Sequence, residues 1–70
     1  MSKNDVVPSA AAERLARKAG VERISKEAVE ALAGVLEDYA KSVSVSAVKY
    51  ARYADRSTIK REDVEMAASE

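Results

Sequence analysis

The chain has 70 residues, with twelve Lys and Arg balanced by twelve Asp and Glu, and its formal net charge is zero. It contains neither cysteine nor histidine, which excludes disulfides and the usual Cys/His metal centres. A chain this short gains only about 3–5 kcal/mol from a core of its own. We therefore expect self-association to complete the core.

The sequence predicts one domain, residues 8–70, after a loose N-terminal tail at residues 1–7. Pro8 closes that tail. There is no apolar run of about 18 residues and no signal-peptide segment, so we expect a cytoplasmic protein.

The first predicted helix is "SAAAERLARKA", Ser9 to Ala19, which is rich in strong helix formers. Ser9 is the expected N-cap, and Gly20 is placed to end the helix.

The second predicted helix runs from Ser25, an N-cap candidate, to Ala54 without a proline. Within it, "SVSVSAV" (Ser42 to Val48) alternates as a strand would, but strong helix formers flank it, so we predict that the helix continues. The helical stripe consists of Val29, Leu32, Leu36, Tyr39, Val43, Ala47, Tyr50 and Ala54.

This helix would be about 45 Å long, whereas a compact globule of this size is only about 28 Å across. The apolar stripe would overhang a monomer. We therefore predict an obligate homodimer in which the two central helices cross.

The third predicted helix lies in "IKREDVEMAASE", where the apolar pattern resumes with Ile59, Val64, Ala67 and Ala68. The predicted fold class is thus all-α: a short helix, a long central helix and a short helix.

The sequence carries no nucleophile–base set, so we expect neither an enzyme nor a cofactor or metal. Paired carboxylates such as Glu37–Asp38 and Glu62–Asp63 are interpreted as solvated helix faces.

Seven of the twelve basic residues lie on the first helix and at the two junctions: Arg14, Arg17, Lys18, Arg23, Arg56, Lys60 and Arg61. Crossed central helices would bring the first junction of one chain beside the second junction of its partner. Repeated cationic and hydroxyl groups near helix N-termini suit the phosphates of a duplex. The alternative is that these are ordinary exposed loop charges.

Two segments, "RKAGVERIS" (Arg17 to Ser25) and "DRSTIKREDVEMA" (Asp55 to Ala67), resemble the archaeal-type histones. Their patterns "AGxERxS" and "RxTIKxEDxExA" flank a long helix of the right length. The resemblance extends from about Pro8 to Ala68. It implies a histone fold, a handshake homodimer, and non-sequence-specific wrapping of chromosomal DNA by dimers that stack into tetramers or larger assemblies.

The resemblance also implies residue roles. Arg14 matches the arginine that enters the minor groove and Arg23 the first-loop arginine at the phosphates, while Ser57, Thr58 and Lys60 belong to the DNA-contacting second loop. Two further matches are a loop brace between Arg56 and Asp63 and a stacking position at Gly20, although Gly20 is equally explained as a helix C-cap. The positions of the dimer–dimer contact are Tyr50, Tyr53, Asp63 and Met66.

The chain departs from the family pattern in the second loop. The family usually has Gly-Arg-Lys-Thr where this chain has Asp55-Arg56-Ser57-Thr58. Each dimer thereby loses two cations and gains two anions. Tyr53 stands where a histidine is common, so a His–acid pair is replaced by tyrosines. Their hydroxyls could reach a carboxylate, or their rings could only cap the core.

Two functions follow from these features. The first is DNA packaging by a histone. The second is a histone-fold module whose main partner is another protein, which the zero net charge, Asp55 and the two tyrosines would suit.

Overall fold

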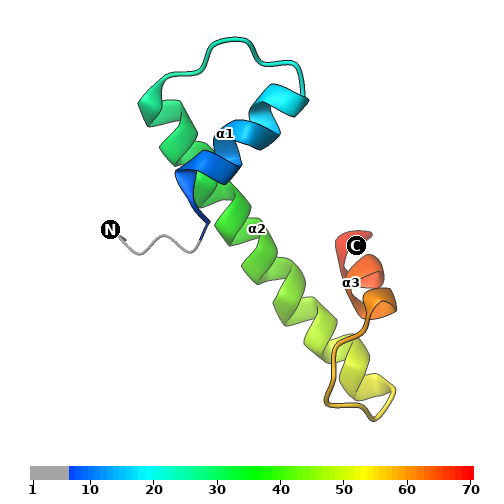
Figure 1. Cartoon of the computed structure of the whole chain (residues 1–70). Coiled ribbons are helices and arrows are strands. Elements are labelled where there is room, and N and C mark those ends of the chain that lie inside the picture. The colour runs from blue at the N-terminus through cyan, green and yellow to red at the C-terminus, as the bar shows by residue number, and fades with distance from the viewer. Residues whose placement is uncertain (1–6) are drawn as a thin grey trace. The chain divides into compact units, whose positions relative to one another are not determined.

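The computed structural model describes residues 7–70 and contains three helices there. They are α1 (Ser9–Lys18), α2 (Lys26–Tyr53) and α3 (Arg61–Ala68), and the described residues include no strand (Figure 1). The all-α prediction with a long central helix is confirmed. The predicted tail lies outside the described residues except for Val7.

The two longer helices begin differently. At α2, the Ser25 hydroxyl accepts a hydrogen bond from the Ala28 N–H at 3.1 Å, so the predicted N-cap is confirmed. The prediction for α1 was wrong, because Pro8 is the N-cap and Ser9 is already helical. Pro8 has an extended backbone, and its carbonyl accepts from the N–H groups of Ala11 and Ala12 without help from a hydroxyl.

Helices α1 and α2 end with the same hydrogen-bond motif. After α1, the Val21 N–H donates to the Ala16 carbonyl at 3.1 Å, and Gly20 has a φ of 100°. After α2, the Arg56 N–H donates to the Ala51 carbonyl at 2.9 Å, and Asp55 has a φ of 62°. These are Schellman caps, whose left-handed position favours glycine. Asp55 therefore holds a strained backbone that Gly20 does not.

The long helix is continuous through Ser42–Val48, the segment in which serine and apolar residues alternate as they would in a strand. The prediction that the helix continues there is confirmed. Its 28 residues correspond to about 42 Å. Ala47 and Ala51, which lie one turn apart, are both buried. Of the predicted stripe, Val29 and Ala47 are buried in the single chain, whereas Tyr39 and Ala54 are exposed. Ala51 is buried although the predicted stripe did not include it.

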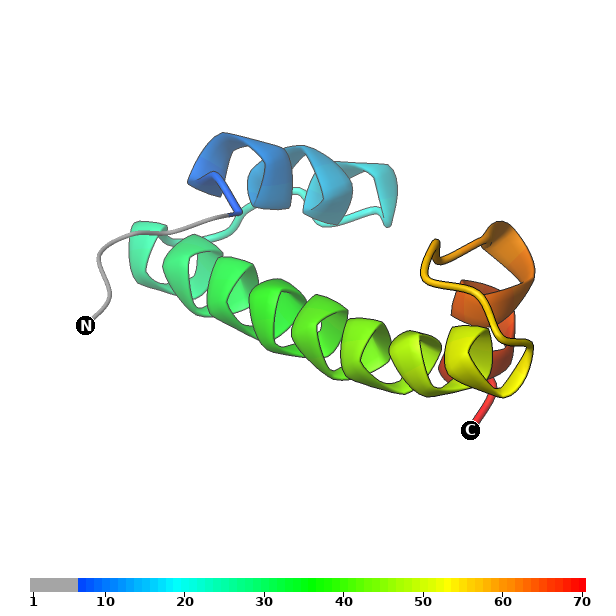
Figure 2. The same ribbon diagram turned by 90° about the horizontal axis from the view of Figure 1, so that it is seen from below.

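The chain divides into two compact units, the first ending at Asp38 and the second comprising Tyr39–Glu70. In the first, α1 lies along the N-terminal part of α2 (Figure 2). The core there is Ala12, Val29 and Ala33, against which further apolar side chains pack: Val7, Ile24, Leu32 and Leu36. Val7, which the sequence assigned to the tail, thus contributes to this core.

In the second unit, α3 lies beside the C-terminal end of α2 (Figures 1 and 2). Its buried residues are Ala47, Ala51, Ala67 and Asp63. Asp63 is the only buried polar residue within residues 7–70. The Asp63 carboxylate thus lies in the packed interior of this unit, so the interpretation of Glu62–Asp63 as a solvated helix face was wrong for Asp63.

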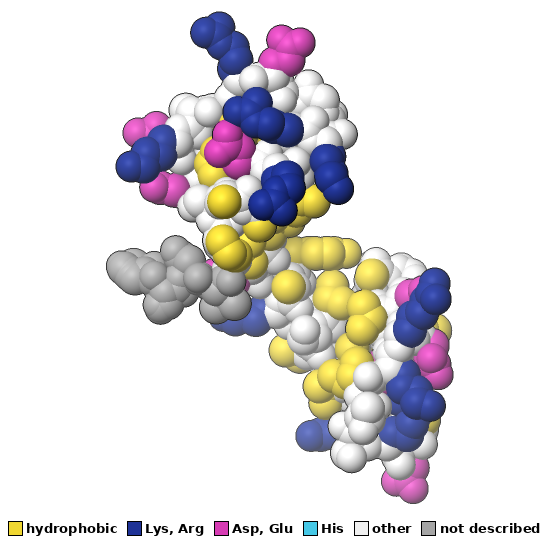
Figure 3. All heavy atoms as spheres, in the orientation of Figure 1, with side chains coloured by type: hydrophobic (Ala, Val, Ile, Leu, Met, Phe, Trp, Pro, Cys, Tyr) yellow, Lys and Arg dark blue, Asp and Glu magenta, His cyan; other side chains and the backbone are white. Residues whose placement is uncertain are grey.

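Large apolar side chains are exposed along α2. Val35, Tyr39 and Val45 are 62%, 58% and 62% exposed. Figure 3 shows hydrophobic side chains at the surface. In the described part of the chain, no buried hydrophobic residue is larger than Val29. No described helix has both the length and the apolar character needed to cross a membrane.

Candidate nucleic-acid interface

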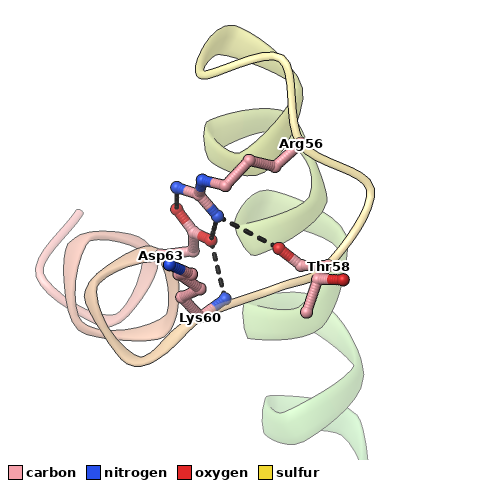
Figure 4. A network of polar contacts seen from close by, with 4 residues as sticks. All are labelled: Arg56, Thr58, Lys60 and Asp63. Carbon is pink, nitrogen blue, oxygen red and sulfur yellow. Dashed lines mark hydrogen bonds and ion pairs between the residues drawn. The ribbon is translucent and has the colours of Figure 1, made fainter.

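A bidentate ion pair stabilises the loop between α2 and α3. The Arg56 guanidinium donates to both carboxylate oxygens of Asp63, at 2.8 and 3.1 Å. It also donates to the Thr58 carbonyl at 3.0 Å, and the Lys60 N–H donates to Asp63 at 2.8 Å (Figure 4). Asp63 stands at the third position of α3, where a carboxylate reaches back to the N-cap N–H. One buried carboxylate therefore fixes both ends of the loop.

This contact shifts the pKa values of both partners. The Arg56 hydrogen bonds, followed by the one from the Lys60 N–H, lower the pKa of Asp63 below its usual value. The hydrogen bond to Asp63 in turn raises the pKa of Arg56. Both shifts favour the charged forms, so the pair is ionised at neutral pH.

Protonation of Asp63 is expected to weaken the fold in acid. A lowered folded-state pKa contributes stability that is present above the unfolded pKa and is lost as pH falls through the folded pKa. Asp63→Asn should therefore lower Tm at pH 7, and its difference from wild type should shrink below about pH 4. Thermal melts followed by circular dichroism from pH 7 to pH 2 measure this. The control is Asp38→Asn, at an exposed residue of α2. A Tm difference for Asp63→Asn that stays constant with pH would contradict it.

The residues of this loop that were predicted to contact DNA are accessible to solvent. Ser57, Thr58 and Lys60 are exposed. Thr58 gives its carbonyl to Arg56, and its side chain points away from the Arg56–Asp63 network (Figure 4). The backbone N–H of Lys60 likewise takes part in this network, since it donates to the Asp63 carboxylate. The internal contacts of the loop thus use backbone groups of Thr58 and Lys60, and the side chains of both residues and of Ser57 remain exposed.

The loop between α1 and α2 also presents basic side chains. Arg14 on α1 and Arg23 in the loop are exposed, and neither forms an ion pair with any described residue. Arg17 is used internally, since it bonds Glu13 at 2.8 Å. Gly20, with its positive φ, has no atom within 4 Å of an added Cβ. The left-handed backbone of the helix C-cap therefore explains why position 20 is a glycine. The space in which a side chain would lie at this position is open.

Arg52 was missed by sequence reasoning. It lies in the last turn of α2 and lines a surface hollow together with Asp55, Arg56 and Ser57. Its position in the last turn of the predicted helix, next to the second loop, was the available signal. Arg52 places a guanidinium at the same hollow as Ser57.

The four residues predicted for a dimer–dimer contact surround one apolar hollow. Tyr50, Tyr53, Asp63 and Met66 line it together with Ala54 and Glu62. The two tyrosine rings meet edge to face at 6.3 Å, an arrangement that aromatic pairs favour. Tyr53 is 83% exposed and Met66 is 53% exposed. The hollow therefore presents rings and a thioether outward, while the Asp63 carboxylate is occupied by Arg56.

A tyrosine hydroxyl does reach a carboxylate, but the acid is Glu70. The Tyr50 hydroxyl donates to Glu70 at 2.6 Å, and the Ser46 hydroxyl donates to its other oxygen at 3.2 Å. The hydrogen bond to Glu70 raises the pKa of Tyr50. This contact joins Glu70, two residues after α3, to α2 and holds the Tyr50 ring.

Two relatives resemble the chain over most of its length. It is 51% identical over 61 residues to one of the subunits of the archaeal histone HAN1 of Thermococcus zilligii, covering 87% of this chain and 91% of that protein. It is 38% identical over 61 residues to the probable archaeal histone 3 of Methanocaldococcus jannaschii, with the same coverage of 87% and 91%.

Family membership rests on a match over nearly the whole chain. The family described as histone-like transcription factor (CBF/NF-Y) and archaeal histone matches residues 6–68. Neither that description nor the two relatives denotes an enzyme, in agreement with the sequence-based expectation. The chain therefore has the histone fold and belongs to the family of histone-like transcription factors and archaeal histones.

Proposed function

We propose that this protein binds and compacts duplex DNA without sequence specificity, as a histone homodimer associated with the chromosome in the cytoplasm. The observation that carries the proposal is the second loop. The Arg56–Asp63 pair rigidifies it from within, while Ser57, Thr58 and Lys60 remain exposed. Exposed hydroxyl and ammonium groups such as these can bind phosphates, and phosphate contacts position a protein on DNA without reading its sequence. The identity of 51% to an archaeal histone supports the same function.

The dimer is proposed from the apolar surface of a single chain. The largest buried hydrophobic residue in the described part is a valine, whereas Val35, Tyr39 and Val45 on α2 are more than half exposed. Large exposed apolar surfaces mark association sites. A second copy, its α2 crossing the first in a histone handshake, would cover them and complete the core.

In such a dimer, each first loop lies beside the partner's second loop. Arg23 of one chain and Thr58 and Lys60 of the other then form a phosphate-binding group, and the dimer has two of them. Arg14 is placed to enter the minor groove, where a narrow groove attracts arginine. The hydroxyl of Ser57 and the cation of Arg52 extend the same surface.

Replacing Lys60 or Arg23 with alanine is expected to weaken binding equally on all sequences. Each removed phosphate contact reduces the slope of log affinity against log salt by about 0.9. A dimer carries two copies, so each variant should lose about 1.8 units. Fluorescence anisotropy between about 50 and 200 mM salt measures the slope.

Lys41→Ala, at an exposed residue in the middle of α2, is the charge-matched control. A slope for Lys60→Ala equal to that of wild type would show that its ammonium does not contact DNA.

Stacking of dimers is proposed at the hollow formed by Tyr50, Tyr53 and Met66. Asp63 belongs to the same hollow, but its carboxylate already accepts three hydrogen bonds. The contact between dimers would therefore rest on aromatic and thioether packing. Gly20, with open space beside it, would allow neighbouring turns of a larger DNA-wrapped assembly to approach closely.

A protein partner is the second candidate function. Tyr53 is 83% exposed beside Met66, and exposed aromatic and methionine side chains are typical of protein interfaces. The chain also has no net charge with which to attract DNA. This function predicts no binding to duplex DNA even at low salt.

A further inference from the structure

Arg17 connects α1 to the loop that carries Arg23. One of its guanidinium nitrogens donates to the Glu13 carboxylate at 2.8 Å, and the other donates to the Glu22 backbone carbonyl at 3.0 Å. Glu13 and Arg17 are four residues apart on α1, with the acid N-terminal to the base, which is the favourable order on a helix. The fork geometry of a guanidinium allows both bonds at once.

The second loop contains a similar device. There, Arg56 binds the Asp63 carboxylate and the Thr58 carbonyl. In both loops an arginine therefore links a helix carboxylate to a loop carbonyl. In each case that carbonyl belongs to, or directly precedes, a residue proposed to contact phosphate.

The Glu22 carbonyl is part of the peptide unit that ends at the Arg23 nitrogen. Because a peptide unit is planar, a hydrogen bond to its oxygen limits rotation of the whole unit, and with it the direction in which Arg23 leaves the backbone. We propose that Glu13 and Arg17 are positioning residues that hold Arg23 for phosphate binding. The inference rests on the proposed DNA-binding function.

This arrangement reverses the effect expected from charge alone. Glu13 is an acid on a DNA-facing element, so its removal should strengthen attraction to phosphate if only charge matters. If Glu13 holds Arg17 in place, its removal should instead weaken binding. The sign of the change therefore distinguishes positioning from simple electrostatics.

The effect on overall stability is expected to be small. The Arg17 and Glu13 side chains are 52% and 43% exposed, and exposed ion pairs contribute little to folding. Alanine at position 13 is also a better helix former than glutamate. Glu13→Ala and Arg17→Lys should therefore leave the Tm and helix content nearly unchanged.

The first test needs no DNA. Backbone ¹⁵N relaxation of residues 21–24 should give order parameters of about 0.85 in the wild-type dimer. In Glu13→Ala and Arg17→Lys the order parameters of the same residues should be clearly lower, about 0.6. The lysine variant keeps the charge but lacks the fork. Equal order parameters in all three proteins would overturn the inference, whatever the protein binds.

The second test measures affinity for an arbitrary duplex at a fixed salt concentration. Glu13→Ala and Arg17→Lys should each weaken binding by about twofold to tenfold, the range that one net hydrogen bond supports, with the salt slope unchanged because no phosphate contact is lost. The double variant should be no weaker than Arg17→Lys alone, since both changes remove one linkage. Glu30→Ala is the matched control, because it removes an exposed acid of α2 that forms no ion pair with a described residue.

Tighter binding by Glu13→Ala, equal to that of Glu30→Ala, would show that charge alone acts and would overturn the inference. Absence of DNA binding by the wild-type protein is a different result. It would contradict the proposed function, and the order parameters would then show that Arg17 orders the loop for another partner or not at all.

Discussion

Leu36→Asp is expected to abolish folding and not merely to weaken association. Leu36 packs against the cluster of Ala12, Val29 and Ala33 in the first unit, and the proposed partner helix would cover its remaining surface. Losing a buried leucine costs about 2–5 kcal/mol, and an unpaired buried carboxylate adds to that. Each dimer carries the change twice, against a total stability of about 5–15 kcal/mol.

Circular dichroism and sedimentation at micromolar concentration measure this result. Leu36→Asp should show no helical signal and no dimer. Ser44→Asp places the same charge at an exposed position of α2 and should remain a folded dimer. A helical monomer of Leu36→Asp would contradict the view that core and dimer interface are one.

The second large effect is expected at Asp55 and Ser57, the two positions of the second loop that depart from the usual family pattern. Asp55→Gly combined with Ser57→Lys should tighten DNA binding and steepen the salt slope by about 1.8 units per dimer, because two lysines are added. Removing two acids beside the phosphates should strengthen binding further. Affinity measured against salt concentration tests both effects.

The structure adds an effect on stability. From the sequence alone, the double variant would be expected to leave dimer stability nearly unchanged. Asp55, however, has a φ of 62°, and a left-handed residue costs up to about 1–2 kcal/mol outside glycine, less for aspartate. Asp55→Gly alone should therefore raise stability by up to about 1 kcal/mol. Ser57→Lys alone separates the two effects, since it should change the slope and not the Tm. Parallel salt lines of equal affinity would mean that the loop points away from DNA.

Helix boundaries were predictable where local chemistry decides them. The Ser25 hydroxyl and Gly20 mark the ends of their helices in the sequence as in the structure. The start of α1 was misassigned by one residue, because a serine after a proline looks like an N-cap although the proline backbone already serves. The αL conformation of Asp55 was not predicted, since aspartate gives no glycine-like signal.

The site was predictable where it resembles a known family and not where it depends on contacts of this chain. The resemblance brought Arg56 and Asp63 together. No pattern indicated the bond from Arg17 to the Glu22 carbonyl, because a backbone acceptor has no sequence signature. The bond from Tyr50 to Glu70 spans 20 residues and depends on how α3 packs beside α2. These contacts arise from packing, which periodicity does not determine.

The most direct test of the proposed function is binding of the wild-type dimer to two unrelated duplexes of equal length. An electrophoretic shift titration at low and at moderate salt should show stepwise retardation, with equal affinity for both duplexes and weaker binding at the higher salt. No retardation at low salt, or strong preference for one duplex, would contradict non-sequence-specific DNA binding through the two loops.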